Sequence, residues 1–242
     1  MNFSNTTALG RLVRLPLRLV PRTAVVPVLS GPLRGARWIV GAATHGSWLG
    51  TYEAAKQQLI ERALKPGSVF YDVGANAGFY SLLASKRGAR AYAFEPLPEN
   101  LRFLHEHVRL NAANVVVVEA AVGREAGEAK FAISESRAQG ALSSEGTLPV
   151  KVVSLDGFIA AGHPAPDVIK MDIEGGEVEA LRGMRETLRG MGETLARNPT
   201  IFLATHSERI HEECLAILEA AGYRTSLIEA SELLAEPSAA GG

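Results

Sequence analysis

The sequence predicts an α/β fold in which a mostly parallel, twisted sheet carries helices on both faces. Short apolar runs alternate with helical patterns along most of the chain, an order that is typical of parallel sheets. A glycine-rich stretch, VGANAG, joins the first such run to a helical stretch. The 242 residues, 47% of them hydrophobic, suit one large domain whose core needs neither a disulfide nor a structural metal.

The first half of the pattern begins with a helix and then alternates strands with helices. Apolar residues recur at helical spacing from Trp48 to Leu64, and a Lys-Pro-Gly sequence ends the run. The later runs SVFYD, ARAYAFE and VVVVEAAV are rich in β-branched and aromatic residues, as strands are. The elements expected here are helices over residues 46–64, 79–86 and 98–111 and strands over 68–72, 89–95 and 115–122.

The second half adds an insertion to this alternation. Between residues 123 and 156, two short strands of alternating polarity flank a loop rich in serine and glycine, which predicts an inserted β-hairpin. The last stretch is small and polar, and we expect it not to pack. The elements expected are hairpin strands over 129–134 and 148–154, core strands over 167–172, 201–205 and 223–228, helices over 177–188 and 208–221, and an unpacked tail over 230–242.

Charge divides the chain into a basic extension and an acidic body. Residues 1–52 contain six arginines and no acid, so the other 190 residues carry 19 basic and 26 acidic side chains, a net charge of −7. This acidity disfavours a nucleic-acid-binding protein. We therefore expect a basic N-terminal extension over residues 1–45 and a main domain over residues 46–229.

Four arginines between residues 11 and 22 recur at steps of three and four, but Pro16, Pro21 and Pro27 interrupt the helix that would align them. We favour a loosely packed leader, and the alternative is an arm that makes peripheral contact with anionic lipid. No apolar run is long enough for a spanning helix. Cys214 is the only cysteine, so a reducing cytoplasm is the expected location.

The strongest local signal is the loop from Asp72 to Gly78, at a predicted strand-to-helix junction. Its glycines allow a tight turn and a close backbone approach to a ligand, and the helix start offers unpaired N–H groups. No glycine stands two positions after Gly74, so the GxGxxG dinucleotide pattern is absent, as is the Lys-Ser/Thr ending of a P-loop. A ligand with a positive end and no pyrophosphate fits better, with Asp72 accepting hydrogen bonds from it.

Glu95 closes the second predicted strand, 23 residues after Asp72. In doubly wound sheets an acid at this place hydrogen-bonds the hydroxyls of an adenosine ribose. The alternative for each acid alone is a helix cap or a surface charge. Together, around a glycine loop, the two carboxylates predict a nucleoside site at the carboxyl edge of the sheet.

Further acids and a histidine follow the fourth and fifth predicted strands. Asp172 and Glu174 are candidates for chemistry over the same crevice, while Glu177 suits the first turn of a helix. His206 stands where it could take a proton from a substrate hydroxyl, although a structural histidine is the alternative. Carboxylates suit Mg²⁺ or Mn²⁺, but no histidine or asparagine is near in sequence, so we predict no metal site. His105 and His107 are expected to face solvent.

At these residues the sequence resembles the FkbM family of S-adenosylmethionine-dependent methyltransferases. The resemblance covers about residues 46–229 and is carried by SVFYDVGANAGFYSLLAS, AFEPLPENLRFLHEHVRLN, VVVVEAAVG, VKVVSLD and DVIKMDIEGGEVEALRGM, in that order. It implies a Rossmann-like class I methyltransferase that transfers a methyl group to a hydroxyl of a small molecule, sugar or glycan. It also implies cofactor contacts from Asp72, Gly74, Asn76, Gly78 and Glu95, adenine contacts from Glu119 and Ala120, and a place near the sulfonium for Asp172.

The sequence departs from the family in two places. An acid is common in the family where Ala204 stands, so no catalytic acid is expected there and His206 is our substitute. The chain ends soon after Ile228, so the family's final antiparallel hairpin is expected to be incomplete or to be completed by other segments. A nucleotide-dependent oxidoreductase of related fold and a noncatalytic adenosyl-binding or membrane-docking module stay as alternatives, and the sequence does not indicate an oligomeric state.

Overall fold

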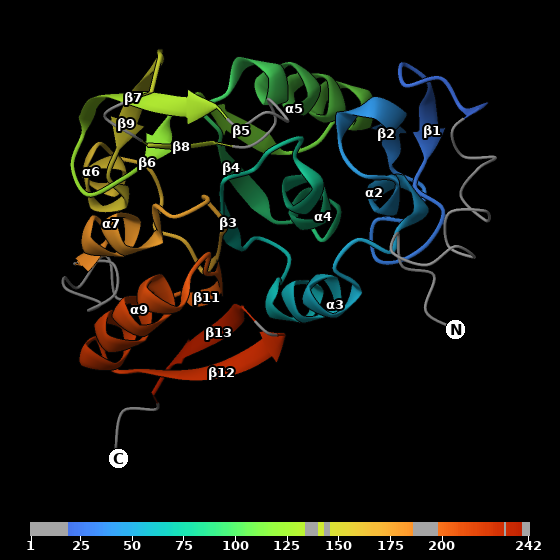
Figure 1. Cartoon of the computed structure of the whole chain (residues 1–242). Helices are drawn as coiled ribbons and strands as arrows, with labels where there is room; N and C mark the ends of the chain where they lie inside the picture. The colour runs from blue at the N-terminus through green and yellow to red at the C-terminus, as the bar shows by residue number, and fades with distance from the viewer. Residues whose placement is uncertain (1–18, 134–139, 143–145, 186–197, 230, 239–242) are drawn as a thin grey trace.

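A seven-stranded sheet forms the centre of the computed structural model, which describes residues 19–133, 140–142, 146–185, 198–229 and 231–238 (Figure 1). Five neighbouring strands are parallel to one another. At one edge two further strands are added, and each pairs antiparallel with the strand before it in the sheet. The strand order is β12 (Tyr223–Glu229), β13 (Glu232–Pro237), β11 (Thr200–Ala204), β10 (Val168–Met171), β3 (Val69–Val73), β4 (Arg90–Phe94) and β5 (Val115–Val118).

Helices cover both faces of this sheet, as predicted (Figure 1). One face packs against α6 (Leu155–Ala160), α7 (Glu177–Arg182) and α9 (Glu208–Ala220). The other packs against α3 (Ala54–Ala63), α4 (Phe79–Lys86) and α5 (Pro98–Asn111). The side chains of β3 show the reason, because Phe70 belongs to one apolar cluster and Tyr71 to the other. Of the helices that the structure describes, none combines the length and apolar character needed to cross a membrane.

The predicted hairpin is part of a second sheet. Its strands β7 (Gly127–Ile133) and β9 (Leu148–Val153) pair antiparallel, and β8 (Gly140–Leu142) and β6 (Ala121–Val122) complete the order β6-β9-β7-β8. The strand predicted over residues 115–122 is therefore divided. The backbone turns after Val118, so β5 stays in the central sheet while β6 leaves it to pair with β9.

The expected boundary at residue 45 does not coincide with a structural boundary. Strands β1 (Val25–Pro27) and β2 (Arg37–Ile39) form a hairpin that packs on the domain, and Trp38 is fully buried there. The helix predicted over residues 46–64 is two helices, α2 (His45–Leu49) and α3, because Gly50 ends α2 in a left-handed conformation. The prediction for the arginines before residue 19 lies outside the described residues.

The expectation that residues 230–242 do not pack is wrong for β13. This strand lies between β11 and β12, and Leu233 and Ala235 are buried in the core. The final antiparallel hairpin, expected to be incomplete, is therefore present. The LLA sequence of this strand is flanked by acidic and small residues, so the composition of the segment does not indicate a strand. Hydrogen bonding to a neighbouring strand on each side stabilises β13 although its apolar run is short.

His107 of α5 ties the N-terminal hairpin to the domain, although it was expected to face solvent. The ring is fully buried and stacks on Trp38 at a centroid distance of 4.0 Å. Nε2 accepts a hydrogen bond from the backbone N–H of Ile39 at 2.9 Å, so Nδ1 carries the proton and donates to the carbonyl of Ala77 at 2.7 Å. This histidine has to be neutral to make both bonds.

Because of His107, the protein is expected to become less stable as the pH is lowered. Burial lowers the pKa of His107 to about 4, below its value in an unfolded chain, so between about 6.5 and 4 the unfolded chain binds a proton that the folded chain does not. The contribution of His107 to the free energy of unfolding is complete above about pH 6.5. It is lost as the pH falls to about 4, and the loss is on the order of 3 kcal/mol. Urea unfolding at pH 7, 6 and 5 should show a weaker pH dependence in His107→Gln than in wild type. His105→Gln, on the exposed face of the same helix, is the control, and an unchanged slope in His107→Gln contradicts this account.

Candidate functional site

A cavity of about 530 Å³ opens at the carboxyl ends of β3, β4 and β10. Residues from several parts of the chain line it. Among them are most of the loop after β3, here called the glycine loop (residues 74–78), the acids that follow β4 and β10, residues of the second sheet, and the N-terminal segment (residues 22–52). Carboxyl ends of parallel strands meet at one edge of a sheet, which is why motifs far apart in sequence share this cavity. The predicted location of the site is therefore where the structure has its cavity.

The glycine loop lies directly against the backbone that follows β10. Gly74 has a φ of 76°, and a Cβ added there would overlap the carbonyl oxygen of Asp172. The N–H groups of Gly74 and Ala75 both donate to the carbonyl of Phe94, which fixes the loop on β4. Gly78, at the start of α4, does not line the cavity and leaves room for Leu104 instead.

Asp72 lies behind the cavity wall. It is buried, accepts a hydrogen bond from Ser81 Oγ at 2.6 Å, and its Oδ1 lies 3.6 Å from Nζ of Lys170. Lys170 itself lines the cavity, where its Nζ donates to the carbonyl of Gly74 at 2.8 Å and lies 3.9 Å from Asp172 Oδ2. Asp72, a predicted site residue, therefore does not line the cavity itself but forms an ion pair with Lys170, which does and which was not predicted.

Glu95 lines the cavity and holds the glycine loop. Its Oε2 accepts from the N–H of Asn76 at 2.8 Å, and its Oε1 accepts from the N–H of Leu97 at 2.9 Å and from Asn100 Nδ2 at 3.2 Å. Burial raises the pKa of Glu95 above its ordinary value, against the opposing effect of these donors. The carboxylate is thus positioned before any ligand binds.

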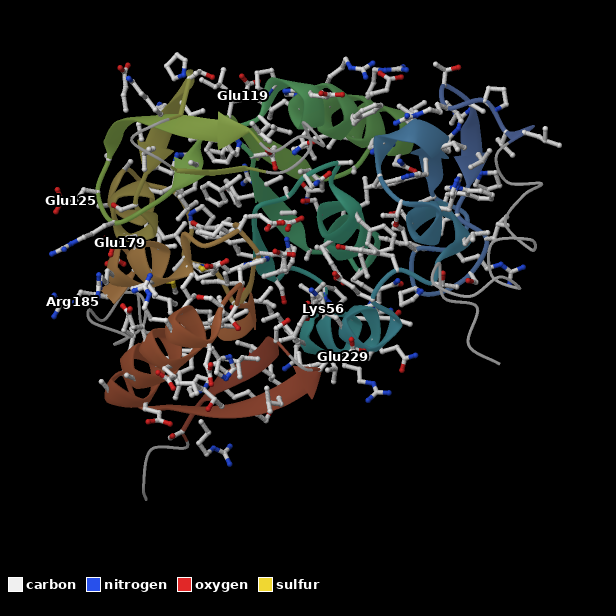
Figure 2. The ribbon with its side chains drawn as sticks, viewed as in Figure 1. Lys56, Glu119, Glu125, Glu179, Arg185 and Glu229 are labelled. Atoms are coloured by element: carbon white, nitrogen blue, oxygen red, sulfur yellow. The ribbon has the colours of Figure 1, made fainter. Side chains whose placement is uncertain are left out.

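The two residues predicted to contact an adenine separate in the structure. Ala120 lines the cavity. The Glu119 side chain is 61% exposed and pairs with Nε2 of His105 at 2.9 Å, and Figure 2 shows it at the outer edge of the molecule. The side chain of Glu119 is therefore removed from the predicted site, because the turn between β5 and β6 points it outward.

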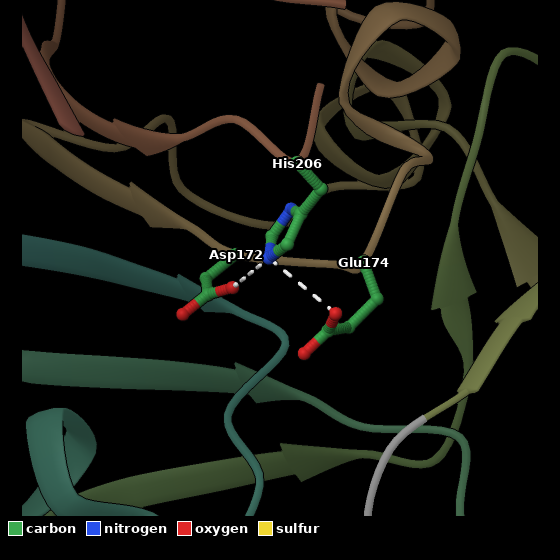
Figure 3. Close-up of side chains that lie close together, drawn as sticks. All are labelled: Asp172, Glu174 and His206. Carbon is green, nitrogen blue, oxygen red and sulfur yellow. Dashed lines mark ion pairs between the residues drawn. The ribbon is translucent and has the colours of Figure 1, made fainter. Parts of the chain in front are cut away.

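Asp172, Glu174 and His206 form an acid–imidazole cluster at the ends of β10 and β11 (Figure 3). Nε2 of His206 lies 3.4 Å from both Asp172 Oδ1 and Glu174 Oε2. Nδ1 of His206 donates to Oε1 of Glu177, which is fully buried, at 2.7 Å. The two acids line the cavity, whereas His206 stands behind them. Glu177, predicted as a helix-start acid, also orients the imidazole.

The charges of the cluster are strongly coupled. The hydrogen bond with Glu177 raises the pKa of His206 above its ordinary value, burial opposes this, and the carboxylates of Glu177, Asp172 and Glu174 add to it. Burial alone would raise the pKa of Asp172, but nearby cations, above all Lys170, outweigh it and the pKa lies below its ordinary value. Asp172 is therefore an anion at neutral pH, and His206 titrates above the usual histidine range.

One atom from each cluster residue lies within 4.8 Å of the others, a spacing that a divalent cation could bridge. Lys170 and His206 already balance part of the carboxylate charge there. The sequence predicts no metal site here, and that stays a prediction.

Two parts of the cavity were missed from the sequence. Lys170 stands in the apolar strand DVIKMD, where a charged side chain is unusual, and this could have indicated a buried ion pair. The N-terminal segment contributes Arg22 and Trp38 among others. No local pattern relates these residues to a sheet edge, so periodicity could not have found them.

Comparison with known proteins gives one family and two curated relatives. The sequence model described as "Methyltransferase FkbM domain" matches residues 72–225. The hexuronic acid methyltransferase AglP of Haloferax volcanii is 33% identical over 129 residues, which are 52% of this chain and 53% of that protein. The ribosomal protein L11 methyltransferase of Caldanaerobacter subterraneus is 35% identical over 72 residues, 28% of this chain and 23% of that protein. The chain thus spans about half or less of these relatives.

A solved structure supports the fold. The precorrin-6y C5,15-methyltransferase of Geobacter metallireducens superposes with a TM-score of 0.50 at 18% identity, covering 77% of this chain and 88% of that one.

The close approach at Gly74 predicts a position-specific loss of stability. Alanine at Gly74 has to displace the backbone of Asp172, so Gly74→Ala should lower the free energy of unfolding by about 3 kcal/mol or more. Gly67 has a similar φ of 82° and no atom within 4 Å of an added Cβ, so Gly67→Ala should cost only about 1–2 kcal/mol of backbone strain. Urea unfolding of both variants checks this, and equal losses would contradict the tight approach.

Proposed function

This chain belongs to the FkbM methyltransferase family, whose model matches more than half of it, and we propose from this premise that it methylates a hydroxyl of a sugar or glycan. Its Rossmann-like fold is that of class I methyltransferases. The family match gives no support to the oxidoreductase alternative. We assign the activity to one domain that runs from about residue 20 through β13 and includes the N-terminal hairpin.

S-adenosyl-L-methionine is the cofactor of this family, and the residues of the cavity fit it. The space of about 530 Å³ lies in the range of cofactor sites, which is about 300–1,000 Å³. Gly74 and Asn76 would hold the methionine end, Glu95 the ribose and Ala120 the adenine. Asp72 and Gly78 would act from behind by supporting the loop. The anionic Asp172 complements the positive charge that the sulfonium carries.

The observation that carries the proposal is that one cavity joins the glycine loop and Glu95 to the carboxylates of Asp172 and Glu174. The cofactor supplies an electrophilic methyl carbon on a sulfonium. The residues of the cavity wall would hold the acceptor hydroxyl beside this carbon, and alignment of two reactants can lower a barrier by about 7–11 kcal/mol. The cofactor would keep the electron pair of its C–S bond on sulfur, and the acceptor oxygen would supply the pair of the new C–O bond.

The acid–imidazole cluster receives the proton of the acceptor hydroxyl. We assign its path from the hydroxyl through the carboxylate of Asp172 to Nε2 of His206. Glu174, at the same distance from Nε2, stabilises the resulting imidazolium, and Glu177 keeps the ring in place. General acid–base help of this kind contributes about 10² to 10⁴ in rate.

The relative from Haloferax volcanii supports a sugar as acceptor, since its name describes a hexuronic acid methyltransferase. The part of the cavity wall that comes from the N-terminal segment also suits a sugar. It offers the hydroxyls of Thr44 and Ser47 for hydrogen bonds and the ring of Tyr52 for the apolar face of a pyranose.

Cofactor binding is expected to depend on Glu95 and not on Glu119. Removing the buried carboxylate takes away an acceptor for the ribose and releases the N–H of Asn76, so Glu95→Ala should weaken S-adenosylmethionine binding by about 10²-fold or more in calorimetry. Glu119→Ala removes an exposed acid outside the cavity and should bind like wild type.

Circular dichroism melts of both variants show whether they remain folded. Wild-type affinity in a folded Glu95→Ala would refute the assigned nucleoside site. Tight cofactor binding by wild type without turnover on any sugar would favour the noncatalytic adenosyl-binding alternative.

The pH dependence of turnover is expected to follow His206. The imidazole accepts a proton only when neutral, so turnover should rise with pH through the pKa of His206, which lies above the ordinary value of about 6.5. Glu177→Gln removes the main cause of that shift and should move the acid limb of the kcat profile to lower pH. Glu179→Gln changes an exposed acid that pairs with Arg182 and should leave the limb in place.

His206→Asn should lower kcat by about 10²-fold with no change in cofactor affinity. If kcat stays the same, or if Glu177→Gln and Glu179→Gln give identical profiles, His206 has no part in proton transfer.

A further inference from the structure

We infer that Glu53 is a positioning residue for the methyl-transfer site, although it does not line the cavity. Its carboxylate holds the side chain of Tyr80, and the ring of Tyr80 in turn holds the ammonium of Lys170 beside the carboxylate of Asp172. The inference rests on the proposed function, because it assigns a further role in the same reaction. It also brings a residue outside the family match, which begins at residue 72, into the machinery of the site.

Glu53 has a backbone conformation that glutamate rarely adopts. It precedes α3 with a φ of 43° and a ψ of 52°, which is the left-handed region. A residue with a Cβ is strained there, and only asparagine, aspartate and histidine are several-fold enriched in it among residues other than glycine. Such strain persists where the surroundings impose it, and it gathers at functional sites. At Glu53 the surroundings that impose it are the partners of the carboxylate.

One oxygen of the Glu53 carboxylate binds two partners. Oε2 accepts a hydrogen bond from Tyr80 Oη at 2.7 Å and lies 2.8 Å from Nζ of Lys56. The Lys56 side chain is 3% exposed and also pairs with Glu232. Burial, and next the charge of Glu53, raise the pKa of Tyr80 above its ordinary value, so the phenol keeps its proton and donates it. The carboxylate therefore connects the start of α3 to the first turn of α4.

The ring of Tyr80 carries this contact to the cavity, which it lines. The ammonium of Lys56 lies 5.6 Å from the ring centroid, and the ammonium of Lys170 lies 5.9 Å from it. An aromatic face attracts a cation within about 6 Å of its centroid. Lys170 is the lysine whose Nζ lies 3.9 Å from Oδ2 of Asp172. A displacement of the Tyr80 ring is therefore transmitted to the Lys170–Asp172 pair.

The charge of Asp172 also responds to this cluster directly. Burial acts to raise the pKa of Asp172, whereas the charge of Lys170 and then that of Lys56 lower it below its ordinary value. Glu53 balances part of the charge of Lys56. Removing the Glu53 carboxylate therefore makes the surroundings of Asp172 more positive. A cationic group placed beside Asp172 should then bind less well, whereas a neutral group of similar shape should not.

Two analogues of the cofactor that differ in charge test this expectation. Sinefungin carries an ammonium group where S-adenosylmethionine carries the methyl sulfonium, and S-adenosylhomocysteine has a neutral thioether there. Calorimetry of both analogues with the full chain gives a ratio of affinities that reports the charge around Asp172. In Glu53→Gln the affinity for sinefungin should fall by about threefold or more relative to S-adenosylhomocysteine.

Glu61→Gln is the matched control. Glu61 belongs to α3, its side chain is 32% exposed where that of Glu53 is 26% exposed, and it lies 3.7 Å from a cation, Arg87. It does not contact Tyr80 or Lys56, so Glu61→Gln should keep the wild-type ratio.

Two substitutions at Glu53 separate positioning from a structural role. Glu53→Asp keeps the charge and suits the left-handed conformation better, so it should restore the wild-type ratio. Glu53→Gly relieves the strain but has no carboxylate, so it should be at least as stable as Glu53→Gln in urea and should show the same lowered ratio. A residue that only stabilised the fold would lower the affinities for both analogues equally.

Tyr80→Phe tests the relay through the tyrosine. It keeps the ring and removes the hydroxyl that Glu53 holds, so it should lower the ratio in the same direction as Glu53→Gln. The double variant should be no worse than Glu53→Gln alone, because both substitutions break one hydrogen bond. Additive losses would overturn the relay.

The outcomes distinguish this inference from the proposed function. An unchanged ratio in a folded Glu53→Gln, or an equal fall in Glu61→Gln, would overturn the positioning role, and binding of both analogues by wild type would leave the proposed function standing. If wild type binds neither analogue, the proposed function fails and the inference fails with it. Circular dichroism melts show which variants are folded.

Discussion

The buried ammonium of Lys170 holds together the edge of the sheet on which the site is built. It joins the end of β10 to the end of β3, about 100 residues earlier, because it contacts the carbonyl of Gly74 and the carboxylates of Asp72 and Asp172. A charge that is 5% exposed is tolerated only when such partners surround it. The register makes this arrangement direct, because Lys170 of β10 lies opposite Asp72 of β3. The glycine loop can then approach the Asp172 backbone so closely that only glycine fits at position 74.

The N-terminal segment is also tied to the site by one buried side chain, that of His107. His107 bonds to Ile39 on one side and to Ala77 of the glycine loop on the other, and it stacks on Trp38. The N-terminal segment and the glycine loop are therefore positioned next to each other by one neutral imidazole. A chain segment outside the family match is in this sense as much a part of the domain as the sheet edge within that match.

The sequence predicted those features that depend on local periodicity and on parallel-strand geometry. The core strands, the helices on both faces, the glycine loop, Glu95 and the gathering of Asp172, Glu174 and His206 at one edge all follow from them. The partners of a buried charge and of a late strand depend on long-range pairing, which local patterns do not give. The apolar strand around Lys170 could have indicated burial but not the partners of the ammonium, and β13 has the composition of a tail. The direction of Glu119 depends on a turn that takes β6 into a second sheet.

The position of β13 also bears on how the chain assembles during synthesis. This strand lies between β11 and β12 and is the last of the described strands to leave the ribosome. Until then, β11 presents an open edge of unpaired backbone groups that another nascent chain could occupy. Lys56 of α3, which Figure 2 shows close to these strands, pairs with Glu232 at the start of β13, 176 residues later in the sequence. The ion pair between Lys56 and Glu232 therefore connects the early and late parts of the chain at the stage when β13 covers the exposed edge of β11.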